Sequence, residues 1–271
     1  MLNPLLNPTL AAAPAEPAIS REDEQDEYSR RFAGIGRLYG TDALTRFEQA
    51  HVLVIGIGGV GSWAAEALAR SAVGRLSLMD MDVLVASNIN RQLPALSSTL
   101  GMDKIQAMAQ RLREINPRIQ LTLVDDMLSA DNVAQVLSDP PNVVLDCMDD
   151  VKAKLALMLH CRFHKIPLIV AGGAGGKHDP LTLRCADLSQ TEYDPMLAKL
   201  RRTLRKDYGI GRKSGEKMGI PCVYSVEQPW QPDNCTVGGL QCGGYGSATA
   251  VTASFGMALA SEALKRLAKS P

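Results

Sequence analysis

The chain has 271 residues, of which 46% are hydrophobic but only 4% aromatic, so any core must be built mainly from aliphatic side chains. Its 29 basic and 29 acidic residues give a formal net charge of zero. This balance excludes a uniformly basic nucleic-acid-binding surface, although not a local basic patch. The length fits one large α/β domain, alone or with a small appended part.

The first 26 residues are predicted to form a disordered leader. The stretch MLNPLLNPTLAAAPAEP contains no Lys or Arg, unlike the start of a secretion signal, and an acidic segment follows it. We expect a single domain over residues 27–268. Its core would cover 51–172, and a C-terminal part that faces the substrate would cover 173–268.

Strands and helices alternate through the first two-thirds of the chain. Short apolar runs predict the strands, and longer Ala-rich or amphipathic segments predict the helices. The predicted strands cover 51–56, 75–80, 119–124, 142–147 and 167–171, and the helices between them cover 60–71, 102–115, 130–137 and 152–164. Strands this apolar favour a doubly wound, mostly parallel sheet with helices on both faces, a Rossmann-like α/β fold.

A C-terminal extension of added strands and helices is expected after residue 172. A Gly-rich turn is followed by predicted strands at 181–186 and 222–226 and predicted helices at 195–208 and 248–268. Residues 234–261 contain no charged side chain, but Gly, Ser and Thr interrupt their apolar residues. We therefore predict a buried loop and helix there rather than a membrane span.

The cysteines indicate a reducing environment. No two of them form a C-x-x-C pair, so we expect free thiols, no structural zinc site and a cytoplasmic location. The six are Cys147, Cys161, Cys185, Cys222, Cys235 and Cys242.

A glycine motif predicts a nucleotide site. Gly56, Gly58 and Gly61 form G-x-G-x-x-G between a predicted strand and a predicted helix, and Asp80 ends the next strand. Such glycines let backbone N–H groups approach a phosphate, and the acid can accept hydrogen bonds from a ribose. The pattern supports an adenine nucleotide without saying which one.

Cationic and polar residues after Asp80 favour ATP over NAD. Arg91 and Lys104 can compensate the charge that builds up when pyrophosphate leaves, with Asn88 and Asn90 as polar neighbours. Solvated surface charges are the alternative interpretation of these two cations. Asp149 follows the fourth strand, where an acid can hold Mg²⁺ on the phosphates.

A basic run in the C-terminal part is a candidate contact for RNA phosphates. The alternative is a solvated helix face. The run contains Lys199, Arg201, Arg202, Arg205 and Lys206.

The run HVLVIGIGGVGSWAAEALARSAVGRLSLMDMDVLVASNINRQ resembles the nucleotide-binding core of the ubiquitin-activating-type superfamily. That superfamily includes the enzymes that adenylate the sulfur carriers of thiamine and molybdopterin synthesis. More specifically, RFAGIGRLYG, KIPLIVAGGAGGKHDP and GSATAVTASFG resemble the bacterial tRNA threonylcarbamoyladenosine dehydratases. The resemblance covers roughly residues 28 to 268.

The resemblance implies a homodimeric enzyme that uses ATP and Mg²⁺ to dehydrate the threonylcarbamoyl group on adenosine 37 of tRNA. It implies that Asp149 binds Mg²⁺ and is essential, that Arg91 and Lys104 contact the triphosphate, and that the partner subunit lends an arginine. Arg31 is the best match for the lent arginine, with Arg30 and Arg37 as competitors. A cysteine desulfurase or sulfur-acceptor system is a further implied partner. The ATP site so implied consists of Gly56, Gly58, Gly61, Asp80, Asn88, Asn90, Arg91, Lys104 and Arg31.

The chain also departs from parts of the superfamily. The two C-x-x-C zinc pairs of many sulfur-carrier-activating relatives are missing, and no cysteine has an obvious thioester-forming context. We expect no rhodanese-like or ubiquitin-like domain after residue 268. Position 150 is Asp where many relatives carry Asn, which leaves open which of Asp149 and Asp150 binds the metal.

The sequence alone leaves three rival functions open. An NAD-dependent oxidoreductase would explain the glycines and Asp80, but not Arg91, Lys104 or Asp149. An enzyme that adenylates the C-terminal glycine of a ubiquitin-like sulfur carrier would have the same ATP site. A non-catalytic nucleotide-binding scaffold would bind ATP without releasing pyrophosphate.

Overall fold

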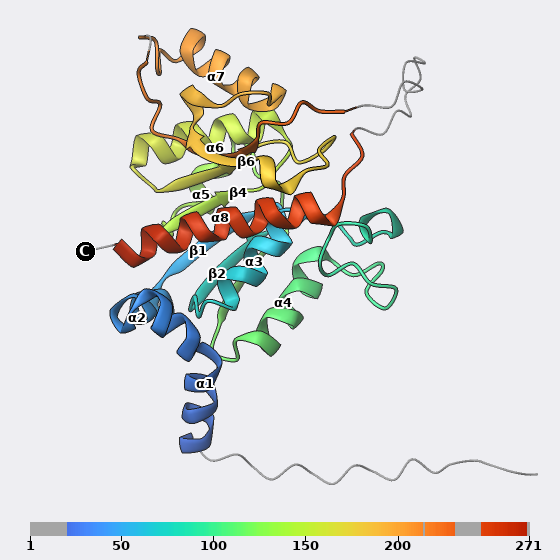
Figure 1. The fold of residues 1–271 in the computed structure, drawn as a ribbon, viewed down its shortest axis with the longest axis vertical. Coiled ribbons are helices and arrows are strands. Elements are labelled where there is room, and N and C mark those ends of the chain that lie inside the picture. The colour runs from blue at the N-terminus through green and yellow to red at the C-terminus, as the bar shows by residue number, and fades with distance from the viewer. Residues whose placement is uncertain (1–20, 214, 231–244, 270–271) are drawn as a thin grey trace, which may run out of the picture.

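A seven-stranded sheet organises the protein, in a computed structural model that describes residues 21–213, 215–230 and 245–269. The strand order is β3-β2-β1-β4-β5-β7-β6 (Figure 1). All neighbours pair in parallel except β6 and β7, which are antiparallel. The strands are β1 (His51–Ile55), β2 (Arg75–Met79), β3 (Gln120–Val124), β4 (Val143–Asp146), β5 (Leu168–Ala171), β6 (Leu183–Asp187) and β7 (Pro221–Ser225).

Helices cover both faces of the sheet, which confirms the predicted doubly wound α/β fold. One face packs against α2 (Thr41–Gln49), α3 (Gly61–Ala69), α4 (Lys104–Ile115) and α8 (Thr249–Lys269). The other packs against α5 (Val133–Val136), α6 (Val151–His164) and α7 (Pro195–Asp207). The described part of the chain also contains three short 3-10 helices, η1 (Ala86–Asn88), η2 (Pro180–Thr182) and η3 (Leu188–Gln190).

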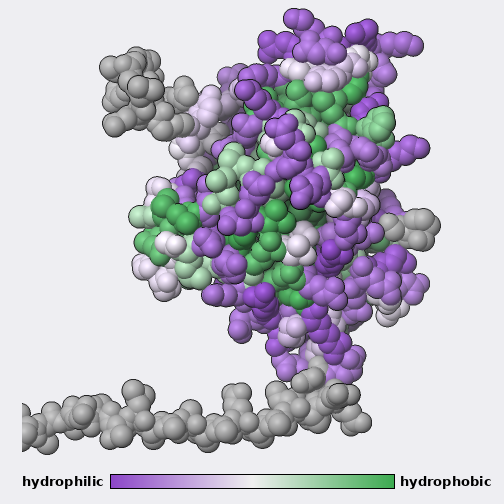
Figure 2. Space-filling view, turned by 180° about the vertical axis from the view of Figure 1, so that it is seen from behind, coloured by the Kyte–Doolittle hydropathy of each residue, from purple (hydrophilic) through white to green (hydrophobic). Residues whose placement is uncertain are grey.

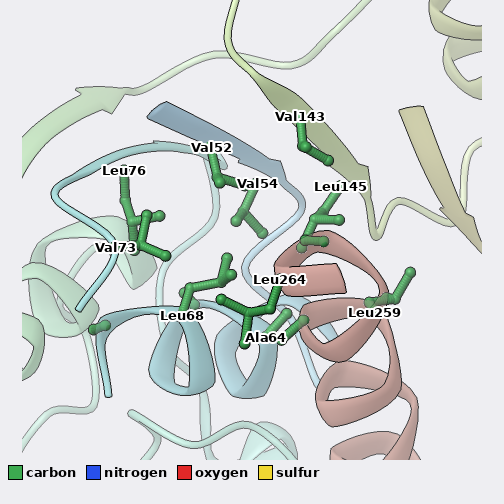
Figure 3. Packing of buried hydrophobic residues seen from close by; sticks show 14 of the residues in the cluster. Val52, Val54, Ala64, Leu68, Val73, Leu76, Val143, Leu145, Leu259 and Leu264 are labelled. Carbon is green, nitrogen blue, oxygen red and sulfur yellow. The ribbon is translucent and has the colours of Figure 1, made fainter. Parts of the chain in front are cut away.

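The central strands are buried on both faces because successive side chains of a strand point to opposite sides. In β1, Val52 and Val54 join one core cluster, whereas Leu53 and Ile55 join the other. Figure 3 shows the first cluster, in which β1 and β4 side chains meet Leu68 of α3 and aliphatic residues of α8. This two-sided burial is why the strands read as continuous apolar runs.

Helix α1 (Arg21–Tyr39) corrects the predicted leader, because residues 21–26 are helical. Residues 1–20 of that leader lie outside the described part. Two pairs at i,i+4 spacing support the first turns of the helix, Asp26 with Arg30 and Glu27 with Arg31. Neither α1 nor α2 was predicted. Helix α1 is mostly polar, and among its described side chains Tyr28 and Phe32 are buried while Ile35 and Tyr39 are partly buried.

The C-terminal part adds an edge to the sheet and a long helix across one face. The β6–β7 pair extends the sheet beyond β5, and α8 packs closely on α3. A Cβ at Gly256 would lie 2.4 Å from the carbonyl oxygen of Val60, so only glycine allows this approach. None of the helices in the described ranges is long and apolar enough to cross a membrane. Part of the predicted uncharged segment, residues 234–244, lies outside those ranges.

Candidate adenylation site

The site lies where the strand order reverses, between β1 and β4. Ligands of doubly wound folds bind outside the carboxyl ends of the strands at this switch point. The glycine loop follows β1, Asp80 follows β2, and Asp149 follows β4. The structure therefore brings residues from three predicted strand ends to one edge of the sheet.

Two of the three predicted glycines are required by the backbone itself. Gly56 has a φ of 87°, and a Cβ there would lie 2.9 Å from the Cys147 carbonyl oxygen. A Cβ at Gly61 would lie 1.9 Å from the Gly56 carbonyl oxygen. At Gly58 the nearest atom would be 3.9 Å away, so packing does not demand glycine there. An open position of this kind leaves room for a phosphate to approach the loop.

Asp80 holds the glycine loop in place. One carboxylate oxygen accepts the Ile57 N–H at 2.7 Å, and the other accepts the Asp82 N–H at 2.9 Å. The buried Lys104 ammonium lies 3.5 Å from Asp80 and 2.5 Å from Asp82. Because Lys104 is buried and paired with two carboxylates, it is not the solvated surface charge of the alternative interpretation. Its contact with a triphosphate stays a prediction. The contact of Asp80 with a ribose stays a prediction.

Arg91 lies directly over the glycine loop. A Cβ added at Gly59 would be 3.1 Å from Arg91 Cγ, and the guanidinium donates to the Ser87 carbonyl and to Asn90 Oδ1. Trp63, which sequence reasoning missed, donates its indole N–H to the Arg91 carbonyl at 3.1 Å. The guanidinium is thus oriented by its own loop.

The two predicted asparagines act within the polypeptide. Asn88 is buried, and its Oδ1 accepts the Val85 N–H at 3.1 Å, which closes the η1 turn. Asn90 Nδ2 donates to the Ser247 carbonyl at 2.8 Å, so it ties the loop to the segment before α8. Contacts of either side chain with ATP stay predictions.

Asp149 and Asp150 have different surroundings. Asp150 Oδ1 accepts the Ala153 N–H at 2.7 Å and so caps helix α6. Asp149 is exposed and has no hydrogen-bond or ion-pair partner among the described residues. Of these two acids, Asp149 is the one whose carboxylate has no partner among the described residues, and its binding of a metal stays a prediction. No group of three metal-ligating side chains occurs in the described ranges. Mg²⁺ would therefore need phosphate and water oxygens besides Asp149.

A buried ion pair that the sequence did not reveal lies under this loop. Lys154 Nζ is 3.0 Å from Asp146 Oδ1 and donates to the Ala171 carbonyl at 2.9 Å, and both side chains are fully buried. Asp146 Oδ1 also accepts the Met148 N–H at 3.1 Å. Burial raises the pKa of Asp146, and Lys154 partly offsets that rise. The pair joins the ends of β4 and β5 and supports the turn that carries Asp149.

The thiol nearest the site is suited to packing rather than to nucleophilic attack. Burial raises the pKa of Cys147 far above its ordinary value, and the neighbouring Asp146 adds to the rise. A thiol in such surroundings stays protonated and inert. The four cysteines of the described part are free thiols, whereas Cys235 and Cys242 lie outside it.

Arg31 lies away from the site. Its guanidinium donates to the Glu114 and Ile115 carbonyls at the end of α4 and pairs with Glu27. Helix α4 begins at the site with Lys104 and runs back toward the start of β3. This contact therefore lies at the amino ends of the strands, opposite the site. Arg30 pairs with Asp26, and Arg37 is exposed.

The predicted basic run forms helix α7, and its five cations divide into two groups. Arg201 donates to the Thr191 carbonyl at 2.8 Å, and Arg205 donates to the Gly211 carbonyl at 3.1 Å. These two side chains hold neighbouring loops. The exposed cations are Lys199, Arg202 and Lys206.

Comparisons with known proteins identify the family of the chain. The model of the ThiF family matches residues 28–271. The chain is 45% identical to the tRNA threonylcarbamoyladenosine dehydratase of Escherichia coli K12, over 89% of this chain and 95% of that protein. It is 37% identical to the Bacillus subtilis enzyme of the same name, over 75% and 76%. It is also 32% identical to the molybdopterin-synthase adenylyltransferase of E. coli K12, over 55% and 58%.

A solved structure shares the whole fold. The crystal structure of the E. coli dehydratase in complex with ATP is similar with a TM-score of 0.83 and 45% identity, covering 93% of this chain and 97% of that one. The family match and these identities confirm the resemblance found in the sequence. The chain therefore belongs to the ThiF family and, within it, to the tRNA threonylcarbamoyladenosine dehydratases.

Proposed function

We propose that the protein is an ATP-dependent enzyme that dehydrates N6-threonylcarbamoyladenosine at position 37 of tRNA. The observation that carries the proposal is the assembly of the glycine loop, Lys104, Arg91 and Asp149 at one sheet edge. Relatives that share this fold over nearly their whole length carry the dehydratase name, and the E. coli enzyme binds ATP and AMP.

The proposed reaction has two steps. The threonyl carboxylate attacks the α-phosphorus of ATP, pyrophosphate leaves, and an acyl-adenylate forms. The carbamoyl group of the same side chain then attacks the activated carbonyl, a proton is lost and AMP leaves, so the nucleoside loses the elements of water. Because the second step is intramolecular, proximity supplies much of its rate and an enzyme nucleophile is not required. The protonated Cys147 agrees with this chemistry.

Each part of the site would have a defined task in this reaction. The loop around Gly58 would receive the phosphates, and Asp80 would hold both the loop and the ribose. Arg91 and Lys104 would compensate the charge on the departing pyrophosphate. Asp149 would hold Mg²⁺, which when bound neutralises charge on the phosphates.

The proposed homodimer has a candidate interface beside Arg91. Apolar side chains gather on the segment between β2 and α4, which is visible at one flank of the molecule in Figure 2. Exposed apolar patches of this kind commonly mark contact surfaces between subunits. Arg31 is the proposed arginine that the second copy lends to the site. The exposed residues are Met81, Val83, Val85, Ile89, Leu96 and Leu100.

The tRNA would contact helix α7. Figure 2 shows a strongly hydrophilic surface at that end of the molecule. Lys199, Arg202 and Lys206 are exposed there and can bind backbone phosphates without reading sequence. A tRNA substrate and the free thiols of the described part support a proposed cytoplasmic location, and a sulfur-transfer system is a further proposed partner.

A second candidate is the adenylation of the C-terminal glycine of a sulfur carrier. It is favoured by the 32% identity to the molybdopterin-synthase adenylyltransferase, although that match covers only 55% of the chain. The ATP site would be the same, and only the carboxylate would differ. An oxidoreductase is not favoured, because it gives no task to Lys104 or Arg91.

Mass spectrometry of the nucleoside tests the proposal. The protein is incubated with ATP, Mg²⁺ and tRNA that carries threonylcarbamoyladenosine, and the tRNA is then digested. We expect that nucleoside to lose the mass of one water molecule, with AMP and pyrophosphate released. Pyrophosphate release that requires a carrier protein, with the nucleoside unchanged, would establish the second candidate instead. ATP binding without any pyrophosphate release would leave only the scaffold.

A further inference from the structure

Exposed aromatic rings gather around the Gly-rich turn that follows β5. Trp230 is 57% exposed and Tyr245 is 44% exposed, in a chain with only two tryptophans. The His178 ring lies edge-on to the Trp230 ring, with centroids 5.5 Å apart. A Cβ at Gly176 would lie 2.7 Å from Tyr245 Cδ1, so the Tyr245 ring packs on this turn. We call His178, Trp230 and Tyr245 the aromatic cluster.

The backbone holds the aromatic cluster in place. Gly176 accepts the Trp230 N–H at 2.8 Å and donates its own N–H to the Gly246 carbonyl at 2.7 Å. The Glu227 carboxylate accepts the N–H groups of His178 and Asp179, each at 3.0 Å, and lies 3.3 Å from His178 Nδ1. Rings that are already fixed lose little conformational entropy when a ligand binds them.

The aromatic cluster lies between the adenylation site and the basic helix. Two residues after Tyr245, the Ser247 carbonyl accepts from Asn90 Nδ2, next to Arg91. On the other side, the Gly173 N–H donates to Asp194 Oδ2 at 2.8 Å, and Asp194 caps the start of α7. The cluster is therefore joined by short stretches of chain to both the site and the start of α7.

We propose that the aromatic cluster stacks on an unpaired base of an RNA loop, adjacent to the nucleoside held at the adenylation site. The inference rests on the proposed function and names a contact that the function does not itself require. A nucleotide can enter a site at a sheet edge only when it is turned out of its stack, which also exposes its neighbours. Exposed aromatic rings bind such bases through their faces, without reading sequence. The cations of α7 would hold the backbone that follows.

Substitutions of Trp230 test the proposal through tRNA affinity measured without ATP. Trp230→Ala is expected to weaken binding on the order of 10- to 100-fold, the usual effect of removing one stacked base contact. Trp230→Phe should keep most of the affinity, whereas Trp230→Leu should lose as much as Trp230→Ala. Tryptophan emission should be quenched by tRNA in the natural protein and not in Trp230→Phe, which keeps only Trp63.

Phe163→Ala is a matched control, because this ring lies just before β5, away from the carboxyl ends of the strands. Phe163, at the end of α6, is 83% exposed, and Phe163→Ala should leave tRNA affinity unchanged. Affinity for ATP should stay the same in all of these variants. Equal tRNA affinity of Trp230→Ala and the natural protein would overturn the proposal, and so would full rescue by leucine, which would indicate apolar packing instead of stacking.

The outcomes separate this inference from the proposed function. If the natural protein binds and dehydrates tRNA but Trp230→Ala does so equally well, only the stacking contact is wrong. If the natural protein binds no tRNA, the substrate and the stacking contact are both wrong.

Discussion

Replacement of Asp149 by alanine is expected to lower the rate of adenylation by about 100- to 1,000-fold, the usual effect of losing one group that stabilises transition-state charge. The side chain is exposed and has no partner in the described part of the chain, so its loss should not lower the free energy of unfolding. The rate is measured as tRNA-dependent AMP release, and stability is measured by urea denaturation.

Asp150→Ala is the matched control, because the two acids are neighbours with different tasks. Asp150 caps α6, so its loss should cost about 1 kcal/mol of stability while adenylation continues. The opposite result, in which Asp150→Ala abolishes adenylation and Asp149→Ala does not, would move the metal site to Asp150.

Lys154→Met is expected to destabilise the fold by about 3–5 kcal/mol, because it leaves a buried carboxylate without its cation. Asp146 Oδ2 already has no hydrogen-bond partner in the described ranges. Without Lys154, the Asp146 carboxylate would keep a single hydrogen bond there, from the Met148 N–H. The free energy of unfolding is measured by guanidinium denaturation at neutral pH.

The double variant Asp146→Asn with Lys154→Met separates the loss of charge pairing from the loss of packing. Without a buried charge, it should be more stable than Lys154→Met alone. Lowering the pH should also reduce the loss in free energy of unfolding that Lys154→Met causes. The pKa of Asp146 is raised in the fold, so protonation favours the folded state as the pH falls toward the ordinary pKa of a carboxyl group. A Lys154→Met protein as stable as the natural one would show that the pair is dispensable.

The sheet and the glycine loop were predictable because each has a local signature. Buried parallel strands read as apolar runs, and Gly56 and Gly61 occupy positions where a Cβ would collide with backbone. Helix α1 was missed because its apolar residues at helical spacing, Tyr28, Phe32, Ile35 and Tyr39, begin only after the polar run REDEQDE. Its polar start therefore reads as a continuation of the leader.

The roles of single polar residues were less predictable, since they depend on partners far away in the sequence. Asn90 meets Ser247, 157 residues later, and Lys154 meets the Ala171 carbonyl. Arg201 and Arg202 are adjacent in a helix, yet only Arg201 binds a neighbouring loop. The residue types show that these side chains are polar, but only the fold shows which of their atoms already form hydrogen bonds.

Oxygen transfer tests the central claim, that the site adenylates the carboxylate of the substrate. The tRNA substrate is prepared with oxygen-18 in both carboxylate oxygens of its threonyl group, and the nucleotides released during the reaction are analysed by mass spectrometry. If the carboxylate attacks the α-phosphorus and ring closure then breaks the carbon–oxygen bond, each AMP carries one oxygen-18 atom and pyrophosphate carries none. Unlabelled AMP, or ADP released with oxygen-18 in phosphate, would contradict adenylation at this site.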